Sequence, residues 1–412
     1  METELHFHLT LFHLNLAMRY YLFPFLLISN FVYSQNIGND FSSCVETFDK
    51  KEFSNFINIS TPKSQFIGIG ESIHGCEDME LFKNEFTKFM LKSRGYKCLI
   101  IESNFASLIP LNRYLNDSSA KLDSFLLRNL LNKTKNWLVH SEPFFDLLVW
   151  IKLQNQSKGL KDRIQLYGMD AQFGIWQAIQ DGRSIFEKYD STFLLSLRDL
   201  IENKSLINKA KWTALDQAKE KYFKETKVSL LDSLSIINIM ESIERFLHNQ
   251  SFSKYSRREE LMFANVKRIS ELILDKESGA ILWAHNGHIA KKWKNYPVLG
   301  TFLFKEYASN YKSIGVDIRK ATFKAIDTDG KADRNKLKTF QVNNDDYFID
   351  KRFVSNDTSC FYLNLNQRGC NPKIKKVFDI GLSFSQKKFS KSPNWYYSKV
   401  KLNDCFDGWF IL

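Results

Sequence analysis

A strand, a helix and a second strand follow one another between residues 65 and 101, and this unit constrains the fold more than any other part of the chain. Residues 65–70 are a short apolar run that ends in glycine. From Glu77 onward, apolar residues recur at three- and four-residue steps up to Gly95, which predicts an amphipathic helix. A second apolar strand follows at residues 97–101. Because the connections are short, the two strands should pair in parallel.

The same pattern returns three more times along the chain. Residues 163–170, 279–284 and 313–317 are predicted as further strands. The segment from about residue 171 to about residue 278 lacks strand signals and shows helical periodicity, which predicts a helical insertion. These patterns predict an α/β fold: a central, largely parallel sheet flanked by helices, with the helical insertion over the cleft.

An apolar N-terminal segment has to be set aside before the fold is considered. Residues 18–34 contain one positive charge, an apolar stretch and an ending at Ser34 that fits a cleavage site, which is typical of a secretory signal peptide. Met18 would then be the true start. A membrane anchor is disfavoured because the apolar run is shorter than the roughly 20 residues that span a bilayer. We therefore expect residues 1–34 to be an extension plus signal, and residues 35–412 to be one exported domain, periplasmic or extracellular, without stable membrane insertion.

The chain is basic, with 58 Lys and Arg residues against 46 Asp and Glu residues and a formal net charge of +12. The lysines are spread along the whole chain and do not gather in one stripe. A solvated surface therefore explains them better than a nucleic-acid partner does. The sequence carries no signal for an oligomeric state.

The six cysteines show no CxxC pair and no zinc-ribbon spacing. Cys98 lies inside an apolar strand and is predicted to be simply buried. Cys360 and Cys370 are close enough in sequence to form a disulfide in an oxidising compartment, and the sequence leaves that pairing open.

Titratable residues follow the predicted strands directly. Glu71 and His74 stand three residues apart after the first strand, and Glu102 ends the second. Open α/β sheets build their ligand sites at the carboxyl ends of strands, so these side chains can face one cleft. A carboxylate bonded to one imidazole nitrogen fixes the tautomer and raises the basicity of the other nitrogen, which suits proton transfer. The alternative is a buried polar network that only ties the strand ends together.

A second histidine pair, His285 and His288, follows another predicted strand with a spacing that lets both rings converge across one turn. Together with the first group they are also suited to ligate zinc, iron or manganese. No Gly-x-Ser-x-Gly sequence occurs, which argues against a serine hydrolase of the α/β-hydrolase kind. Asp170 ends a further predicted strand beside the same cleft and is another candidate.

Several motifs, in this order and spacing, closely resemble the erythromycin esterase family. They are Gly68-Ile69-Gly70-Glu71-Ser72-Ile73-His74-Gly75, Arg94-Gly95-Tyr96, Ile101-Glu102-Ser103, Asn112-Arg113-Tyr114-Leu115, Tyr167-Gly168-Met169-Asp170, Arg258-Glu259, Met262-Phe263-Ala264-Asn265, Trp283-Ala284-His285-Asn286-Gly287-His288 and Phe406-Asp407-Gly408. The resemblance extends from about residue 60 to the C-terminus. A string of motifs is far more specific than any one of them.

The resemblance implies an enzyme that hydrolyses a small-molecule carboxylic ester or lactone. Opening of a macrolide ring, and with it antibiotic resistance, is typical of the family, and no metal, cofactor or covalent serine intermediate is implied. By residue-for-residue comparison, His74 would be the general base that activates water, with Glu71 and Glu102 orienting it. His285 and His288 would stabilise the tetrahedral oxyanion or protonate the leaving alkoxide.

Four further residues are expected to contact the substrate. Lys83 stands where the family commonly has arginine, and Asp78 where it commonly has glutamate. Both changes alter how far the side chain extends into the pocket. Asp170 is a third candidate. Arg258 matches a family position, and a helix-packing or ion-pair role suits it equally well.

Two other functions stay open at this point. One is a metal-dependent hydrolase or peptidase that uses the same histidines and glutamates. The other is a non-catalytic protein that binds a ligand of the cell envelope, which the signal and the basic charge would suit.

Overall fold

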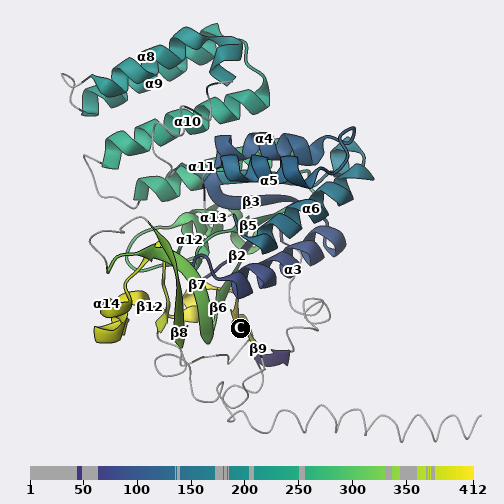
Figure 1. Cartoon of the computed structure of the whole chain (residues 1–412), viewed down its shortest axis with the longest axis vertical. Coiled ribbons are helices and arrows are strands. Elements are labelled where there is room, and N and C mark those ends of the chain that lie inside the picture. Colours follow the sequence, from purple (N-terminus) through teal and green to yellow (C-terminus); the bar gives the residue numbers. More distant parts are fainter. Residues whose placement is uncertain are drawn as a thin grey trace, which may run out of the picture.

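An eight-stranded sheet runs through the middle of the described chain (Figure 1). Its order is β1-β9-β13-β6-β2-β5-β3-β4. All neighbouring strands from β13 to β4 pair in parallel, whereas β9 pairs antiparallel with both of its neighbours, β13 and β1. The strands are β1 Val45–Phe48, β2 Phe66–Ile69, β3 Tyr96–Asn104, β4 Gln165–Asp170, β5 Gly279–Trp283, β6 Tyr311–Asp317, β9 Cys360–Asn364 and β13 Gly408–Ile411. This arrangement confirms the predicted α/β class with a central, largely parallel sheet.

The structure is a computed structural model and describes residues 44–48, 64–134, 136, 140–171, 180, 183, 185–203, 208–249, 256–329, 336–343, 360–367, 370, 372 and 376–412. The signal-like segment at residues 18–34 and the extension before it lie outside the described residues, so export stays a prediction. Within the described part of the chain, no helix is long and apolar enough to cross a membrane.

Helices cover both faces of the sheet (Figure 1). α3, α5 and α6 contribute to a hydrophobic core on one face; α11, α12 and α13 contribute to a second core on the other face, and α4 contributes to both. The bounds are α3 Glu77–Ser93, α4 Phe105–Asn116, α5 Ser124–Lys133, α6 Glu142–Gln156, α11 Ser256–Ile273, α12 Asn286–Ile289 and α13 Leu299–Tyr307. Because both faces are covered, the central strands are apolar on both sides, as expected for a parallel sheet.

β2 and α3 show how local sequence produces this packing. Successive residues of a strand point to opposite faces, so Ile67 joins one core and Phe66 joins the other. Four apolar residues of α3 share one buried face; they are Met79, Phe82, Phe86 and Met90. Full burial of one such side chain stabilises the fold by about 1.5–3 kcal/mol, so packing on the sheet holds the helix in place.

The C-terminal part forms two smaller sheets and two short helices. β7 pairs with β8 and β11, and β10 pairs with β12. The bounds are β7 Lys320–Asp327, β8 Leu337–Asn343, β10 Lys376–Phe378, β11 Ser383–Phe384, β12 Tyr397–Lys399, α14 Gln386–Lys391 and α15 Leu402–Cys405. A bridge between Ile73 and Ile380 joins this part to the segment that follows β2. The C-terminal residues therefore pack beside a predicted functional segment.

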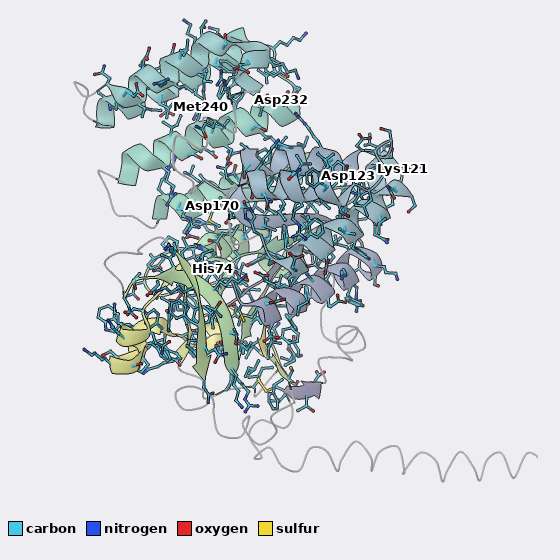
Figure 2. All side chains as sticks on the ribbon, in the orientation of Figure 1. His74, Lys121, Asp123, Asp170, Asp232 and Met240 are labelled. Atoms are coloured by element: carbon cyan, nitrogen blue, oxygen red, sulfur yellow. A yellow bond between two sulfur atoms is a disulfide. The ribbon has the colours of Figure 1, made fainter. Side chains whose placement is uncertain are left out.

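The predicted insertion at about residues 171–278 is helical where the structure describes it. Besides α11 it holds α8 Ser191–Glu202, α9 Asn208–Glu225 and α10 Leu230–Asn249. These three helices share a small core of their own, in which Met240 is buried, and lie beyond α4 and α11 at one end of the molecule (Figures 1 and 2). Its placement over a cleft stays a prediction.

One disulfide joins distant parts of the described chain. Cys44 bonds Cys370, with their Cα atoms 5.7 Å apart, so a Cys360–Cys370 pairing is wrong. The reason is the antiparallel pairing of β1 with β9, in which the Asn364 N–H donates to the Cys44 carbonyl at 2.9 Å. Cys360 lies at the opposite end of β9 and is buried in the core of the other face.

Candidate active site

The carboxyl ends of the parallel strands bring the predicted polar residues to one edge of the sheet. Glu71 follows β2, Glu102 lies near the end of β3, Asp170 ends β4 and His285 follows β5. Glu102 is part of β3, which continues to Asn104 with a register shift at this point. His74 and Asp170 lie on the same side of the molecule (Figure 2). The strand-end prediction therefore places these residues in one region.

A close approach of the backbones joins the two histidine segments. A Cβ atom on Gly70 would lie 2.0 Å from the side-chain oxygen of Asn286, so only glycine fits there. The Asn286 N–H donates to the Glu71 carbonyl at 2.8 Å, and its side-chain amide donates to the Val316 carbonyl at 2.8 Å. Gly75 has a φ of +68°, which lets the chain turn into α3. The two segments are therefore held against each other by their backbones and by the side chain of Asn286.

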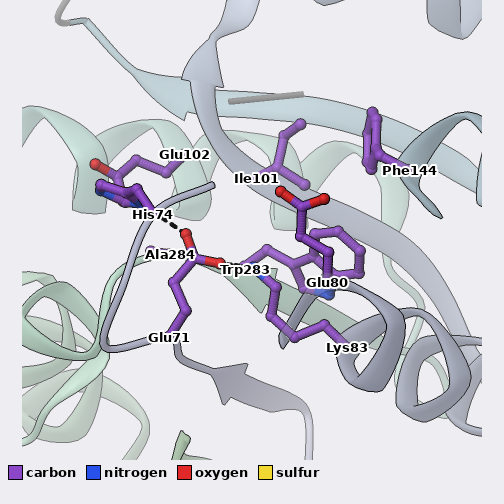
Figure 3. A pocket seen from close by; sticks show the side chains of 9 residues that line it. All are labelled: Glu71, His74, Glu80, Lys83, Ile101, Glu102, Phe144, Trp283 and Ala284. Atoms are coloured by element: carbon purple, nitrogen blue, oxygen red, sulfur yellow. Dashed lines mark hydrogen bonds and ion pairs between the residues drawn. The ribbon is translucent and has the colours of Figure 1, made fainter. Parts of the chain in front are cut away.

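A cavity of about 410 Å³, its open mouth included, lies at this edge (Figure 3). Its lining residues are Glu71, His74, Glu80, Lys83, Ile101, Glu102, Phe144, Trp283 and Ala284. His74 and Glu102 lie at one end, and Ile101, Phe144 and the carboxyl group of Glu80 lie at the other (Figure 3).

His74 and Glu71 form a buried pair on the cavity wall. His74 Nδ1 lies 2.6 Å from Glu71 Oε1, and Lys83 Nζ donates to the other oxygen of the same carboxylate (Figure 3). Burial alone would raise the pKa of Glu71, but the Lys83 ammonium and His74 outweigh it and lower the pKa to about 2. Glu71 is therefore ionised and accepts hydrogen bonds from both partners.

The ionised Glu71 carboxylate assigns the tautomer of His74. An acceptor at 2.6 Å requires the proton on Nδ1, which leaves the lone pair on Nε2. Nε2 has no hydrogen-bond partner among the described residues, and the ring lines the cavity. This geometry can accept a proton from a molecule bound in the cavity.

Glu102 is held by charges behind the cavity wall. Arg258 Nη2 donates to Glu102 Oε1 at 2.7 Å, and the same guanidinium binds both oxygens of Asp170 at 3.0 and 2.7 Å. Burial alone would raise the pKa of Glu102, but His288 and Arg258 hold it well below its usual range. A second carboxylate thus stays ionised beside His74.

His288 is part of this charged group and does not line the cavity. Its Nδ1 lies 2.7 Å from Glu259 Oε1 and its Nε2 lies 3.3 Å from Glu102 Oε1. Burial alone would lower the pKa of His288, but Glu259 and Glu102 raise it to about 10. His288 is therefore protonated at neutral pH; Nδ1 faces Glu259, whereas Nε2 faces Glu102 with Arg258 Nη1 3.2 Å away.

His285 is neutral and engaged with the backbone. Its Nε2 lies 3.1 Å from the Ser72 carbonyl, which can only accept, so the ring proton is on Nε2. Burial lowers the pKa of His285 to about 4, against the opposing effect of Asp379, whose Oδ1 lies 3.6 Å from Nδ1. Its backbone N–H donates to Glu102 Oε2 at 3.0 Å. The ring centroids of His285 and His74 are 5.0 Å apart, so the two rings pack against each other.

The family model of erythromycin esterase matches residues 91–412 of this chain. The chain belongs to the erythromycin esterase family. The matched span includes Glu102, Asp170, Arg258, His285 and His288.

A sequence relative and three solved structures add to the family match. "Putative hydrolase YbfO" of Bacillus subtilis (strain 168) is 20% identical over a match of 297 residues. The match covers 61% of this chain and 64% of that protein, so the chain spans less than two thirds of that protein's length. A succinoglycan biosynthesis protein has a TM-score of 0.65 at 17% identity, covering 92% of this chain and 96% of its own. A Bacillus cereus protein has a TM-score of 0.61 at 17% identity, covering 89% and 97%.

The third structure is a histidine-to-asparagine mutant of the erythromycin esterase EreC in its open conformation. It has a TM-score of 0.63 at 14% identity and covers 89% of this chain and 97% of its own. At such identities the likeness concerns the fold. The names of the family and of the Bacillus subtilis relative both describe hydrolases.

The predicted site residues of this erythromycin esterase family member separate into three groups. The first group lines the cavity: Glu71, His74, Lys83 and Glu102. The second group lies behind the lining: Arg258, His285 and His288 contact Glu102, and Asp170 binds Arg258. Asp78 stands apart, because it is exposed on α3 and does not line the cavity. The helical repeat explains this, since Glu80 and Lys83 are three residues apart on one face of α3 and Asp78 is not on that face.

Three residues of the site were missed from sequence. Glu80 lines the cavity one turn before Lys83, and that spacing was its only signal. Glu259 holds His288 and stands next to Arg258 in a matched motif. Asp379 faces His285 from the C-terminal part of the chain, and its sequence surroundings gave no indication.

The charges of the site bear on the metal alternative. No group of three or more His, Cys, Asp or Glu side chains among the described residues is arranged to hold a metal ion. Glu71 is already bound to the Lys83 ammonium and Glu102 to the Arg258 guanidinium. Each cation occupies a carboxylate that a metal would need and repels a further positive charge.

Proposed function

We propose that this chain is an exported hydrolase of carboxylic esters or lactones in which His74 activates water. The observation that carries the proposal is the pair of His74 and ionised Glu71, 2.6 Å apart, with the free ring nitrogen at the wall of the cavity. The family name and the hydrolase name of the relative support it.

In the first step, His74 Nε2 accepts a proton from water while the water oxygen attacks the carbonyl carbon of the ester. The ring becomes an imidazolium with a proton on each nitrogen, and the carbonyl becomes a tetrahedral oxyanion. Glu71 stabilises the new charge on the ring, because its carboxylate faces Nδ1. A positioned general base contributes about 10²–10⁴ in rate.

In the second step, the tetrahedral intermediate collapses and the bond to the alkoxide oxygen breaks. His74 returns its new proton to that oxygen, so acid and alcohol leave and the ring is neutral again. For a lactone both groups stay on one molecule and the ring opens. No group other than His74 has to exchange a proton in this cycle.

The oxyanion needs a donor or cation at the cavity. Both ring nitrogens of His288 face carboxylates, and the Nε2 proton of His285 is directed at the Ser72 carbonyl. Lys83 lines the cavity, and an ammonium has two N–H groups besides the one donated to Glu71. We therefore assign oxyanion stabilisation to Lys83, in place of the two histidines.

Glu102 suits a role in orienting the attacking water. It lines the cavity together with His74, and Arg258 and the His285 N–H fix both of its oxygens. A fixed, ionised carboxylate accepts a hydrogen bond from water and directs the other water proton toward the base. His288 and Arg258 then act as positioning residues.

Export rests on the signal-like residues 18–34 and is supported by the Cys44–Cys370 disulfide, because disulfides persist mainly in oxidising compartments. Macrolide lactones are the substrate class that the family name suggests. Mass analysis of the secreted protein tests the export proposal: a mature chain that begins after Ser34 supports it, and an intact N-terminus in the cytoplasm contradicts it.

The hydrolysis proposal is tested with a panel of simple esters, lactones and a macrolide, each with and without chelator. Wild type is compared with His74→Ala, and His140→Ala is the matched control, because His140 binds the Leu131 carbonyl away from the cavity. We expect chelator-resistant turnover that falls only in His74→Ala. Turnover lost with chelator would favour a metal-dependent hydrolase, and binding without turnover would favour a binding protein.

A further inference from the structure

Glu80 is the one carboxyl group on the cavity wall that the mechanism above does not use. It lies on α3, one turn before Lys83, and only 7% of its surface is exposed. Its Oε2 atom is buried and has no hydrogen-bond partner among the described residues. A buried acceptor without a partner is unfavourable, and nearly all such atoms in native proteins have a donor, so this atom calls for one.

The surroundings of Glu80 separate it from the reacting groups. Figure 3 shows its carboxyl group beside Ile101 and Phe144, with Trp283 behind, while His74 and Glu102 lie at the other end of the cavity. Glu80 is therefore placed to meet a part of the bound molecule that does not react.

We infer that Glu80 is a specificity-determining residue whose carboxyl group hydrogen-bonds a hydroxyl group on the substrate, away from the ester. The inference rests on the proposed hydrolase function and names the substrate class more closely: hydroxylated esters or lactones. The hydroxyl supplies the donor that Oε2 lacks, and the apolar side chains around it exclude water that would compete.

The charges nearby favour a neutral hydroxyl over an ammonium group. The Lys83 ammonium, one turn further along α3, lies 4.5 Å from the centre of the Trp283 ring on the same wall and repels a second cation. Burial raises the pKa of Glu80 to about 7, an effect that the nearby charges of Glu71 and Glu77 add to and that Ser141 and Lys83 oppose. Both protonation states therefore exist near neutral pH. A hydroxyl group can pair with either state because it both donates and accepts, whereas an ammonium group only donates.

The test measures kcat/KM for nitrophenyl hexanoate, for the same ester with one hydroxyl at each chain position in turn, and for the terminal amino ester. The variants are wild type, Glu80→Leu and Glu80→Gln. Glu85→Leu is the matched control, because Glu85 is exposed on the same helix and pairs with Lys88. Thermal unfolding shows that each variant is folded.

We expect wild type and Glu85→Leu to prefer at least one hydroxylated ester over the plain ester by about tenfold or more, since a site built for a hydroxyl rejects the analogue that lacks it. Glu80→Leu should hydrolyse both equally, through a lower kcat/KM for the hydroxylated ester. Glu80→Gln should keep a reduced preference for the hydroxylated ester over the plain ester. If Glu80→Leu does not fold, the preference measured with Glu80→Gln tests the inference.

Three results would overturn the inference alone while hydrolysis remains: no preference in wild type at any chain position, an unchanged preference in both Glu80 variants, or a higher kcat/KM for the amino ester. Absence of hydrolysis of every ester by wild type would instead overturn the proposed function, and the inference with it. The two failures are therefore distinguishable in one set of assays.

Discussion

Two short segments with similar residues meet at the cavity, residues 70–75 and residues 284–288, and they differ in what their ring nitrogens contact. His74 has one nitrogen bound to Glu71 and the other at the cavity wall. His288 has both nitrogens facing carboxylates, and His285 donates to a backbone carbonyl. A histidine whose ring positions are all engaged fixes its neighbours, whereas one with an open lone pair can react. Clustering in sequence therefore locates a site without assigning the chemistry within it.

The sharpest way to break this comparison is to remove the ring from each segment. His74→Gln should lower kcat/KM for ester hydrolysis by about 10²–10⁴ while the free energy of unfolding changes little, because the general base is lost and few contacts are. His288→Gln should instead lower the free energy of unfolding more than His74→Gln does, and lower kcat/KM less. Steady-state kinetics and urea unfolding of both variants check this. A larger loss of kcat/KM in His288→Gln and a larger loss of stability in His74→Gln would contradict the assigned roles.

The next largest effect concerns the charged group behind the second segment. Arg258→Met leaves the buried carboxylates of Glu102 and Asp170 without their cation, and loss of one partner from a buried ion pair costs about 3–5 kcal/mol. Urea unfolding measures the loss. Arg198→Met is the control, because its pair with Glu202 is exposed and should contribute less than about 1 kcal/mol. Equal effects of the two variants would show that the group behind the cavity is not a stabilising scaffold.

His288 also gives the second segment a pH dependence on the alkaline side, whereas Glu71 in the first segment has its pKa lowered and acts on the acid side. Its pKa is raised from 6.5 to about 10 in the folded protein by Glu259 and Glu102, against the effect of burial. Its contribution to stability is therefore complete below pH 6.5 and is lost as the pH rises through 10. The unfolding free energy of wild type, measured from pH 6 to 10, should fall more steeply than that of His288→Gln. Parallel curves would mean that His288 is not held as an imidazolium.

The last prediction sharpens the role of the first segment. Lys83→Met removes the cation from Glu71 and from the cavity, and we expect kcat/KM to fall by about 10²–10³ as the oxyanion and the carboxylate lose their partner. Lys83→Arg should retain most of the activity, since it keeps the charge. If both variants behave like wild type in the ester assay, the oxyanion is stabilised by another group.

The sequence was sufficient for features that depend on local pattern. The strands, the helix at α3 and the placement of Glu71 and Glu102 at one edge follow from apolar runs and from the parallel pairing that short connections impose. These features need no knowledge of distant segments. Asp78 failed for a related reason, because assigning a residue to one face of a helix requires the helix phase, which a motif alone does not give.

The rest of the site depends on contacts between distant segments. Whether His288 is charged is decided by Glu259 on α11, and the environment of His285 by Asp379 from the C-terminal part. The partner of Cys370 was missed because the pairing of β1 with β9 brings together two cysteines that are 326 residues apart in the sequence. A periodic pattern carries no information on such pairings, so the roles of the histidines had to come from the structure.

The strand order has a consequence for how the protein folds. β5 lies between β2 and β3 in the sheet, although the helices from α4 to α11 separate it from them in the sequence. Contacts so far apart along the chain form slowly, because a long loop must close before they become favourable. His74 can be in place early, but the wall that carries Trp283 and Ala284 arrives only with β5. The return of hydrolysis during refolding therefore reports completion of the sheet, later than the recovery of helix content.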